Sequence, residues 1–155
     1  MPGYKIKNQL QFSLIIDILR VNMNFKTAST MKNLRTLMKY QFPALIFALV
    51  IFIQSSFSQI NVPDFGFSFQ DKIAHAILFG ILGYLITRAF YFGTNDTLRK
   101  NAIVLGILVG TLYALSDEIH QLFVPGRSAD IIDVLADFVG IIVAQLFFVY
   151  KRKFA

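Results

Sequence analysis

Four long runs of apolar residues alternate with short polar segments along this chain. The runs cover residues 41–58, 71–92, 101–123 and 129–150, with ends placed to within a few residues. A transmembrane helix needs roughly 20 predominantly apolar residues, within a range of about 17–25. Each run is therefore long enough to cross the hydrocarbon core once. The pattern predicts an all-α protein, an integral membrane four-helix bundle.

Composition supports placing the chain in a bilayer. Hydrophobic residues make up 55% of the sequence and charged residues only 15%, with a mean hydropathy of +0.59. Soluble domains typically carry about 25% charged residues. There is no Cys, which excludes disulfides, Cys-based zinc sites and thiol nucleophiles. The lipid bilayer is thus the first expected partner.

The positions of the basic residues indicate the topology of the chain in the membrane. The net charge is +6, but Lys and Arg lie almost wholly between and beyond the apolar runs, so we expect no nucleic-acid partner. Residues 1–39 form a basic leader and residues 151–155 a basic tail. Basic flanks remain in the cytoplasm. We therefore expect a membrane domain at 41–150, cytoplasmic termini, and outside loops around Asp64 and Gly126.

Two alternatives concern the N-terminal part. Residues 10–23 are apolar but interrupted by Asp17 and Arg20, so they are too short and too polar to span and at most lie on the membrane surface. Met31 is an alternative true start, which would make the earlier residues an annotation artefact. The run at 41–58 also resembles a cleaved signal peptide, with a small-x-small site at Ser56-Phe57-Ser58.

Acidic residues concentrate where the predicted helices reach one membrane surface. With cytoplasmic termini, this surface is the outer one. An Asp at the centre of a membrane helix costs about 2.5–3.5 kcal/mol on insertion scales, so a cluster requires a reason. We predict an outward-facing polar pocket between the outer ends of three helices. Six of the nine acids lie there: Asp71, Asp117, Glu118, Asp130, Asp133 and Asp137.

Side-chain chemistry assigns roles within this cluster. Glu118 and His75 are the candidate proton-transfer groups. Four residues are expected to bind a ligand: Lys72, Gln121, Arg127 and Asp133. The remaining five have structural explanations as interfacial flanks, helix caps or interhelical hydrogen bonds: Asp71, Asp117, His120, Asp130 and Asp137. Asp133 and Asp137 are expected to point into the bundle, because lipid would penalise them.

Arg127 is the one basic residue in an outside loop. We expect it to pair either with Glu118 or with an anionic ligand. Pro125 and Gly126 turn the chain back over the third helix, and Glu118 has the longer side chain with which to reach Arg127. We therefore assign Glu118, rather than Asp117, as the working acid. Asp117 is expected to bond to Ser116, to His120 or to a neighbouring helix.

Several motifs in this order resemble the VanZ-like family. They are Asp71-Lys72-x-x-His75 with Phe79 and Gly83, Ser116-Asp117-Glu118-x-x-Gln121 with Phe123-Val124-Pro125-Gly126-Arg127, and Asp130-x-x-Asp133 with Gly140. The likeness covers residues 41–150. It implies a small, multi-pass protein of a bacterial cytoplasmic (inner) membrane, in a family named for a member associated with resistance to the glycopeptide teicoplanin. Asp137 departs from the pattern, since members commonly have Asn there.

The function classes that remain differ in what the polar site does. The first is a site that binds or modifies a lipid-linked or anionic envelope molecule. The second is a small proton-coupled transporter, and the third a non-catalytic membrane partner of another envelope protein. We expect no cofactor and no metal, although a metal-dependent version would use His75, Asp117, Glu118 and His120. Whether the protein is an enzyme stays open.

Overall fold

The computed structural model describes residues 3–57 and 70–154, with side chains from residue 20 onward. The chain divides into two units, residues 1–35 and 36–155, and each is considered by itself. The predicted outer loop around Asp64 lies outside the described residues. The first unit is formed by helix α1, Gly3–Thr36, which contains the interrupted apolar stretch at 10–23.

The second unit contains the membrane helices. A π-helical turn, Leu37–Gln41, precedes α2 (Phe42–Ser55), α3 (Gln70–Tyr91), α4 (Asp96–Lys100), α5 (Ala102–Gln121) and α6 (Ile131–Phe154). Four helical stretches are long and apolar enough to cross a membrane: Arg20–Ser55, Gln70–Tyr91, Ala102–Gln121 and Ile131–Phe154. The prediction of an all-α protein with four membrane-spanning helices is confirmed.

Three predicted helix bounds differ from the structure. The first run stops at Ser55, because the backbone N–H of Phe57 bonds to the carbonyl of Gln54, three residues back, in a closing turn. The third run corresponds to α5 and ends at Gln121, and the separate helix α4, capped by the Asn95 side chain, precedes it. The fourth run starts at Ile131 and continues through the basic tail to Phe154.

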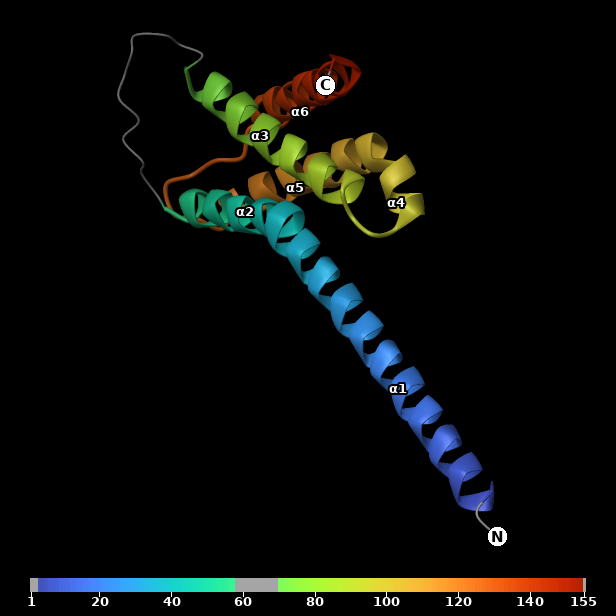
Figure 1. The fold of residues 1–155 in the computed structure, drawn as a ribbon. Helices are drawn as coiled ribbons and strands as arrows, with labels where there is room; N and C mark the ends of the chain where they lie inside the picture. The colour runs from blue at the N-terminus through green and yellow to red at the C-terminus, as the bar shows by residue number, and fades with distance from the viewer. Residues whose placement is uncertain (1–2, 58–69, 155) are drawn as a thin grey trace. The chain divides into compact units, whose positions relative to one another are not determined.

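Helices α3 and α6 form the central pair of the second unit and lie side by side (Figure 1). Their backbones touch where Gly140 lies against the carbonyl of Ala76, a position where any Cβ would collide. Phe79 and Leu82 of α3 pack with Ile141 of α6 in the buried core. Helix α2 packs against α3 and α5 less extensively than α3 packs against α6.

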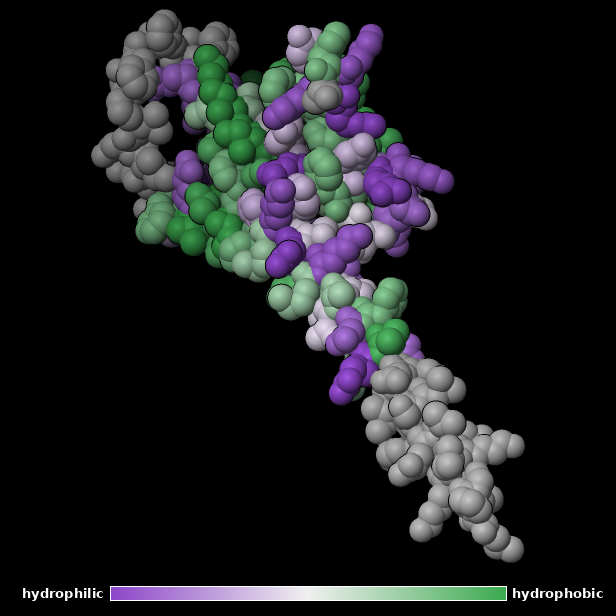
Figure 2. Space-filling model, in the orientation of Figure 1, coloured by the Kyte–Doolittle hydropathy of each residue, from purple (hydrophilic) through white to green (hydrophobic). Residues whose placement is uncertain are grey.

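The outer surface of the helices is apolar. Among the exposed residues are Leu45 on α2, Ile77 on α3, Leu108 on α5 and Leu146 on α6. Exposed apolar surface on this scale is suited to lipid rather than water. On the face shown in Figure 2, hydrophilic residues gather instead over α4 and the C-terminal end of α6. The protein is therefore a multi-pass membrane protein.

The two ends of the bundle differ in charge. At the polar end, α2 and α5 finish while α3 and α6 begin, and the six clustered acids lie there. At the basic end lie Arg88 of α3 and Lys151–Lys153 of α6. Charges therefore occupy the ends, and the apolar core lies between them.

Candidate functional site

A cavity of about 90 Å³ opens at the polar end between α2, α3 and α5. Its deeper wall is apolar and includes Ile51, Leu78 and Phe79. Its polar lining comes from three helices and the corner before α6: Gln54, Ser55, Asp71, His75, Asp117, Gln121 and Arg127. A single water needs only about 10–15 Å³, so the cavity has room for a phosphate or carboxylate group.

Asp117 joins α5 to α2 at one wall of the cavity. Its Oδ1 accepts a hydrogen bond of 2.5 Å from the hydroxyl of Ser55, and its Oδ2 accepts one of 2.9 Å from the Gln121 amide. All three side chains are buried. The predicted bond from Asp117 to a neighbouring helix is present, whereas Ser116 bonds to the carbonyl of Tyr113 and His120 contacts Ser56.

Glu118, the adjacent acid, points to the start of α6. Its Oε2 accepts the backbone N–H of Asp130 at 2.8 Å, and its Oε1 lies 3.4 Å from the Gln121 amide nitrogen. Asp130 in turn caps α6, since its Oδ1 accepts the backbone N–H of Ile132. Glu118 therefore fixes the corner between α5 and α6, and it does not line the cavity.

Lys72 of α3 is bound by two carboxylates of the α6 end. Its ammonium lies 2.7 Å from Asp130 and 2.6 Å from Oδ1 of the buried Asp133. The hydrogen bond from Lys72 lowers the pKa of the Asp130 carboxyl. Lys72 therefore neutralises acids of the protein itself, which leaves it poorly placed to hold an anionic ligand.

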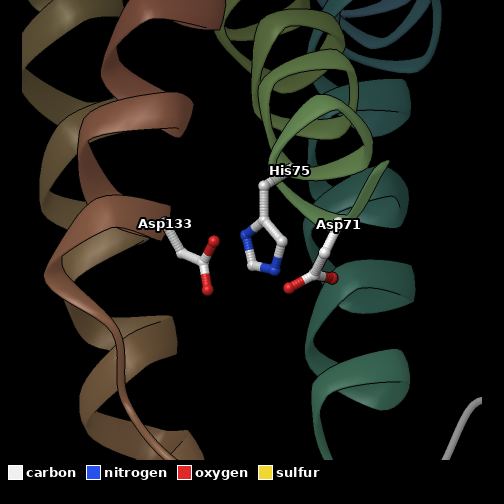
Figure 3. A group of neighbouring side chains, drawn as sticks. All are labelled: Asp71, His75 and Asp133. Carbon is white, nitrogen blue, oxygen red and sulfur yellow. The ribbon is translucent and has the colours of Figure 1, made fainter. Parts of the chain in front are cut away.

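His75 lies one helical turn after Asp71 and faces both α6 and the cavity. Its Nδ1 is 3.2 Å from Oδ1 of Asp137, whose side chain is fully buried. A carboxylate only accepts hydrogen bonds, so an ionised Asp137 places the proton of neutral His75 on Nδ1 and leaves Nε2 as acceptor. Figure 3 shows His75 between Asp71 and Asp133.

Asp71, His75 and Asp133 have ligand atoms within 4.8 Å of one another, a spacing that could hold a metal ion. They are not the set expected for a metal-dependent version, which combined His75 with Asp117, Glu118 and His120. The ammonium of Lys72 already lies against Asp133. Lys72 thus supplies the positive charge that a metal ion would otherwise bring to this carboxylate.

Arg127 reaches the cavity from the corner between α5 and α6. Its Nε donates a hydrogen bond of 3.2 Å to the carbonyl of Phe57. Within the described residues it has no ion pair, and Glu118 bonds elsewhere. The expected Arg127–Glu118 pair is therefore not found among the described residues, and an anionic ligand of Arg127 stays a prediction.

Polar residues that the sequence interpretation did not single out also take part. Ser55 is buried against Asp117, and the core contains a Thr87–Gln145 hydrogen bond of 2.7 Å. Thr87 and Gln145 lie in different apolar runs, and the sequence alone does not show that the two side chains face each other. The predicted inward orientation of Asp133 and Asp137 is confirmed by their burial.

The family comparison covers most of the chain. The sequence matches the VanZ/LLP1 family over residues 10–152, which includes part of the basic leader as well as the 41–150 membrane domain. No curated protein and no solved structure is significantly similar to the chain. The acids, Lys72, His75 and Arg127 of the polar end all lie within the matched region. The chain belongs to the VanZ/LLP1 family.

Proposed function

We propose that this protein binds the anionic head group of a lipid-linked envelope molecule at the outer surface of a bacterial cytoplasmic membrane. The polar end faces outward in this proposal, and both termini are cytoplasmic. The distribution of Lys and Arg supports that orientation, because Arg99, Lys100 and Lys151–Lys153 all lie at the basic end.

The single observation that carries the proposal is the position of Arg127. Its guanidinium borders the polar cavity and has no carboxylate partner among the described residues, whereas Lys72 is held by two carboxylates. A guanidinium binds phosphate or carboxylate groups with two parallel charge-assisted hydrogen bonds. Arg127 is therefore the residue best placed to receive an anion.

His75 is the best placed proton-transfer group in this site. It lines the cavity, and one ring nitrogen faces Asp71 (Figure 3). Asp137 orients the ring through its contact with Nδ1. A positioned His is the commonest general acid or base. Gln121 and Asp117 supply hydrogen-bonding groups beside it. Glu118 and Asp133 would contribute indirectly, by holding the start of α6 and Lys72.

Transport has less support from the geometry. Asp137 and the Thr87–Gln145 pair are the polar groups that a proton path along α3 and α6 would use. The buried apolar residues Phe79, Leu82 and Ile141 separate them. Teicoplanin resistance likewise has no observation in its favour beyond the family.

The test compares molecules retained by Arg127→Ala and by the parent after extraction from native membranes with a membrane-solubilising polymer. We expect mass spectrometry to find an anionic lipid-linked molecule that the parent retains and the variant loses. The free energy of unfolding should fall by less than about 1 kcal/mol, because Arg127 makes a single hydrogen bond with the described residues.

Arg99→Ala is the matched control, since it removes an exposed guanidinium paired with Asp96 at the other end of the bundle. Equal retention by the parent and both variants, or no retained anion at all, would reject the proposal. Retention of another envelope protein in place of a lipid would favour the partner role.

A further inference from the structure

A second hollow, of about 280 Å³, lies at the basic end within the unit of residues 36–155. Its walls come from the π-helical turn before α2, from α3 and from α6. Four cations line it: Lys39, Arg88, Lys151 and Arg152. Its described lining contains no Asp or Glu. We call this hollow the basic pocket.

Among the described residues, no acid pairs with the cations of the basic pocket. Within the described part of the chain, the ion pair at this end joins Arg99 to Asp96, neither of which lines the pocket. Arg88 instead lies 5.0 Å from the ring centre of Tyr40, and Lys39 lies 5.2 Å from the same ring. Arg152 lies 4.3 Å from the ring of Tyr91. Aromatic contacts of this kind orient a cation without cancelling its charge.

The pocket combines these cations with apolar walls. Tyr84, Phe92 and Phe148 line it together with Tyr40, and Tyr84 and Phe148 are in edge-to-face contact. Tyr is typical of the membrane–water interface, where its ring meets hydrocarbon and its hydroxyl meets water. A cavity of this size is at the low end of small-molecule sites, roughly 300–1,000 Å³, and suits a head group better than a whole lipid.

We propose that the basic pocket binds the phosphate of an anionic phospholipid from the leaflet at the basic end. Orientation in the membrane requires only that basic residues lie in the flanking segments, and it does not require them to converge on one hollow. Convergence of four cations from three elements is the arrangement that recognises an anionic head group between transmembrane helices. The aromatic walls favour a lipid over free phosphate, because they extend the pocket toward the acyl chains.

The experiment uses the full chain in nanodiscs of phosphatidylcholine, with and without phosphatidylglycerol. Native mass spectrometry counts bound phosphatidylglycerol, and thermal unfolding reports its effect on stability. We expect Arg88→Gln to weaken phosphatidylglycerol binding by about tenfold, the factor for one lost charge-assisted hydrogen bond. Arg152→Gln, at an exposed position, should weaken it similarly and provides the test if Arg88→Gln does not accumulate.

Arg99→Gln and Lys153→Gln are the controls, because each removes a charge from the same end without touching the pocket. Equal losses in the controls would mean general surface attraction and would overturn the proposal. Equal stabilisation by inorganic phosphate in pure phosphatidylcholine would also overturn it, by identifying a soluble anion as the ligand. The proposal would be established if only Arg88→Gln and Arg152→Gln lost phosphatidylglycerol binding and free phosphate gave no stabilisation.

Discussion

Asp117 and Glu118 are neighbours on α5, yet the structure gives them different surroundings. Asp117 borders the polar cavity and bonds to Ser55 of α2, whereas Glu118 bonds to the backbone of Asp130. A helix turns by about 100° per residue, so adjacent side chains cannot share a direction. The sequence interpretation assigned Glu118 as the working acid, and that stays a prediction. Of the two acids, Asp117 is the one that shapes the cavity wall.

Replacing each acid by its amide distinguishes the role of Asp117 from that of Glu118. Asp117→Asn should lower the free energy of unfolding by about 1–3 kcal/mol, because an amide nitrogen cannot accept one of the two buried hydrogen bonds from Ser55 and Gln121. The displaced Ser55 or Gln121 side chain should disturb the cavity wall and so reduce ligand retention. Glu118→Gln should retain the ligand and lower the free energy of unfolding by less than about 1 kcal/mol, since the side-chain carbonyl of the new amide still accepts the N–H of Asp130. Retention assays and thermal unfolding measure both effects. The opposite ranking would restore Glu118 as the working acid.

The ion pair between Lys72 and Asp130 predicts a dependence on pH. The pKa of Asp130 is lowered from its ordinary value of 3.8 by the hydrogen bond from Lys72. A lowered folded-state pKa stabilises the fold above the ordinary value, and this contribution disappears as pH falls through the folded-state pKa. Asp130→Asn keeps the cap on α6 but removes the charge, so it should lower the melting temperature at pH 7.

Melting temperatures of the Asp130→Asn variant and the parent should begin to converge as pH falls below the ordinary pKa of about 3.8, and should meet below the lowered pKa of folded Asp130. Asp96→Asn is the control, because it removes an exposed acid from the basic end. A difference between variant and parent that persists unchanged at pH 3 would show that the charge of Asp130 is not the cause.

At the scale of elements, the close contact of α3 and α6 positions the site. Gly140 allows the α6 backbone to touch the carbonyl of Ala76, one residue after His75. The same register brings His75 to Asp137 and Lys72 to Asp133. A shift in this packing would therefore separate both pairs.

Gly140→Ala tests this dependence. Its new methyl group would collide with the Ala76 carbonyl. We therefore expect the free energy of unfolding to fall by about 1–3 kcal/mol or more, and the protein to accumulate poorly in the membrane. Gly110→Ala is the matched control, because its methyl group meets mainly the flexible end of Ile141 at 3.1 Å. Similar unfolding curves for the two variants would show that the backbone contact is unimportant.

The lengths of the apolar runs predicted the membrane helices well, because bilayer thickness sets the length of such a helix. Helix ends were less accurate: Ser56 and Phe57 are as compatible with a helix as with the turn they form. The alternating direction of the four predicted helices was enough to predict that the six acids lie at one end. It did not predict that Lys72 bridges Asp130 and Asp133, or that Glu118 bonds to a backbone N–H, because those contacts depend on the rotation of each helix within the bundle.

At the scale of the whole molecule, the two ends are electrostatically distinct. The polar end holds six acids with Lys72 and Arg127, and the basic end holds Arg88 and Lys151–Lys153. Positive flanks set the orientation of membrane proteins. The proposed function depends on this polarity, because an envelope molecule outside the cytoplasmic membrane reaches the cavity only if the polar end faces outward.

Cysteine labelling in intact cells tests that orientation most directly, because the chain contains no Cys of its own. Ser128 is the better probe of the polar end than Gly126, whose φ of 81° disfavours a side chain, and Thr94 probes the other end. An impermeant thiol reagent should label Ser128→Cys and leave Thr94→Cys unlabelled until the cells are opened. Labelling of Thr94→Cys alone in intact cells would place the polar cavity in the cytoplasm and contradict the proposed function.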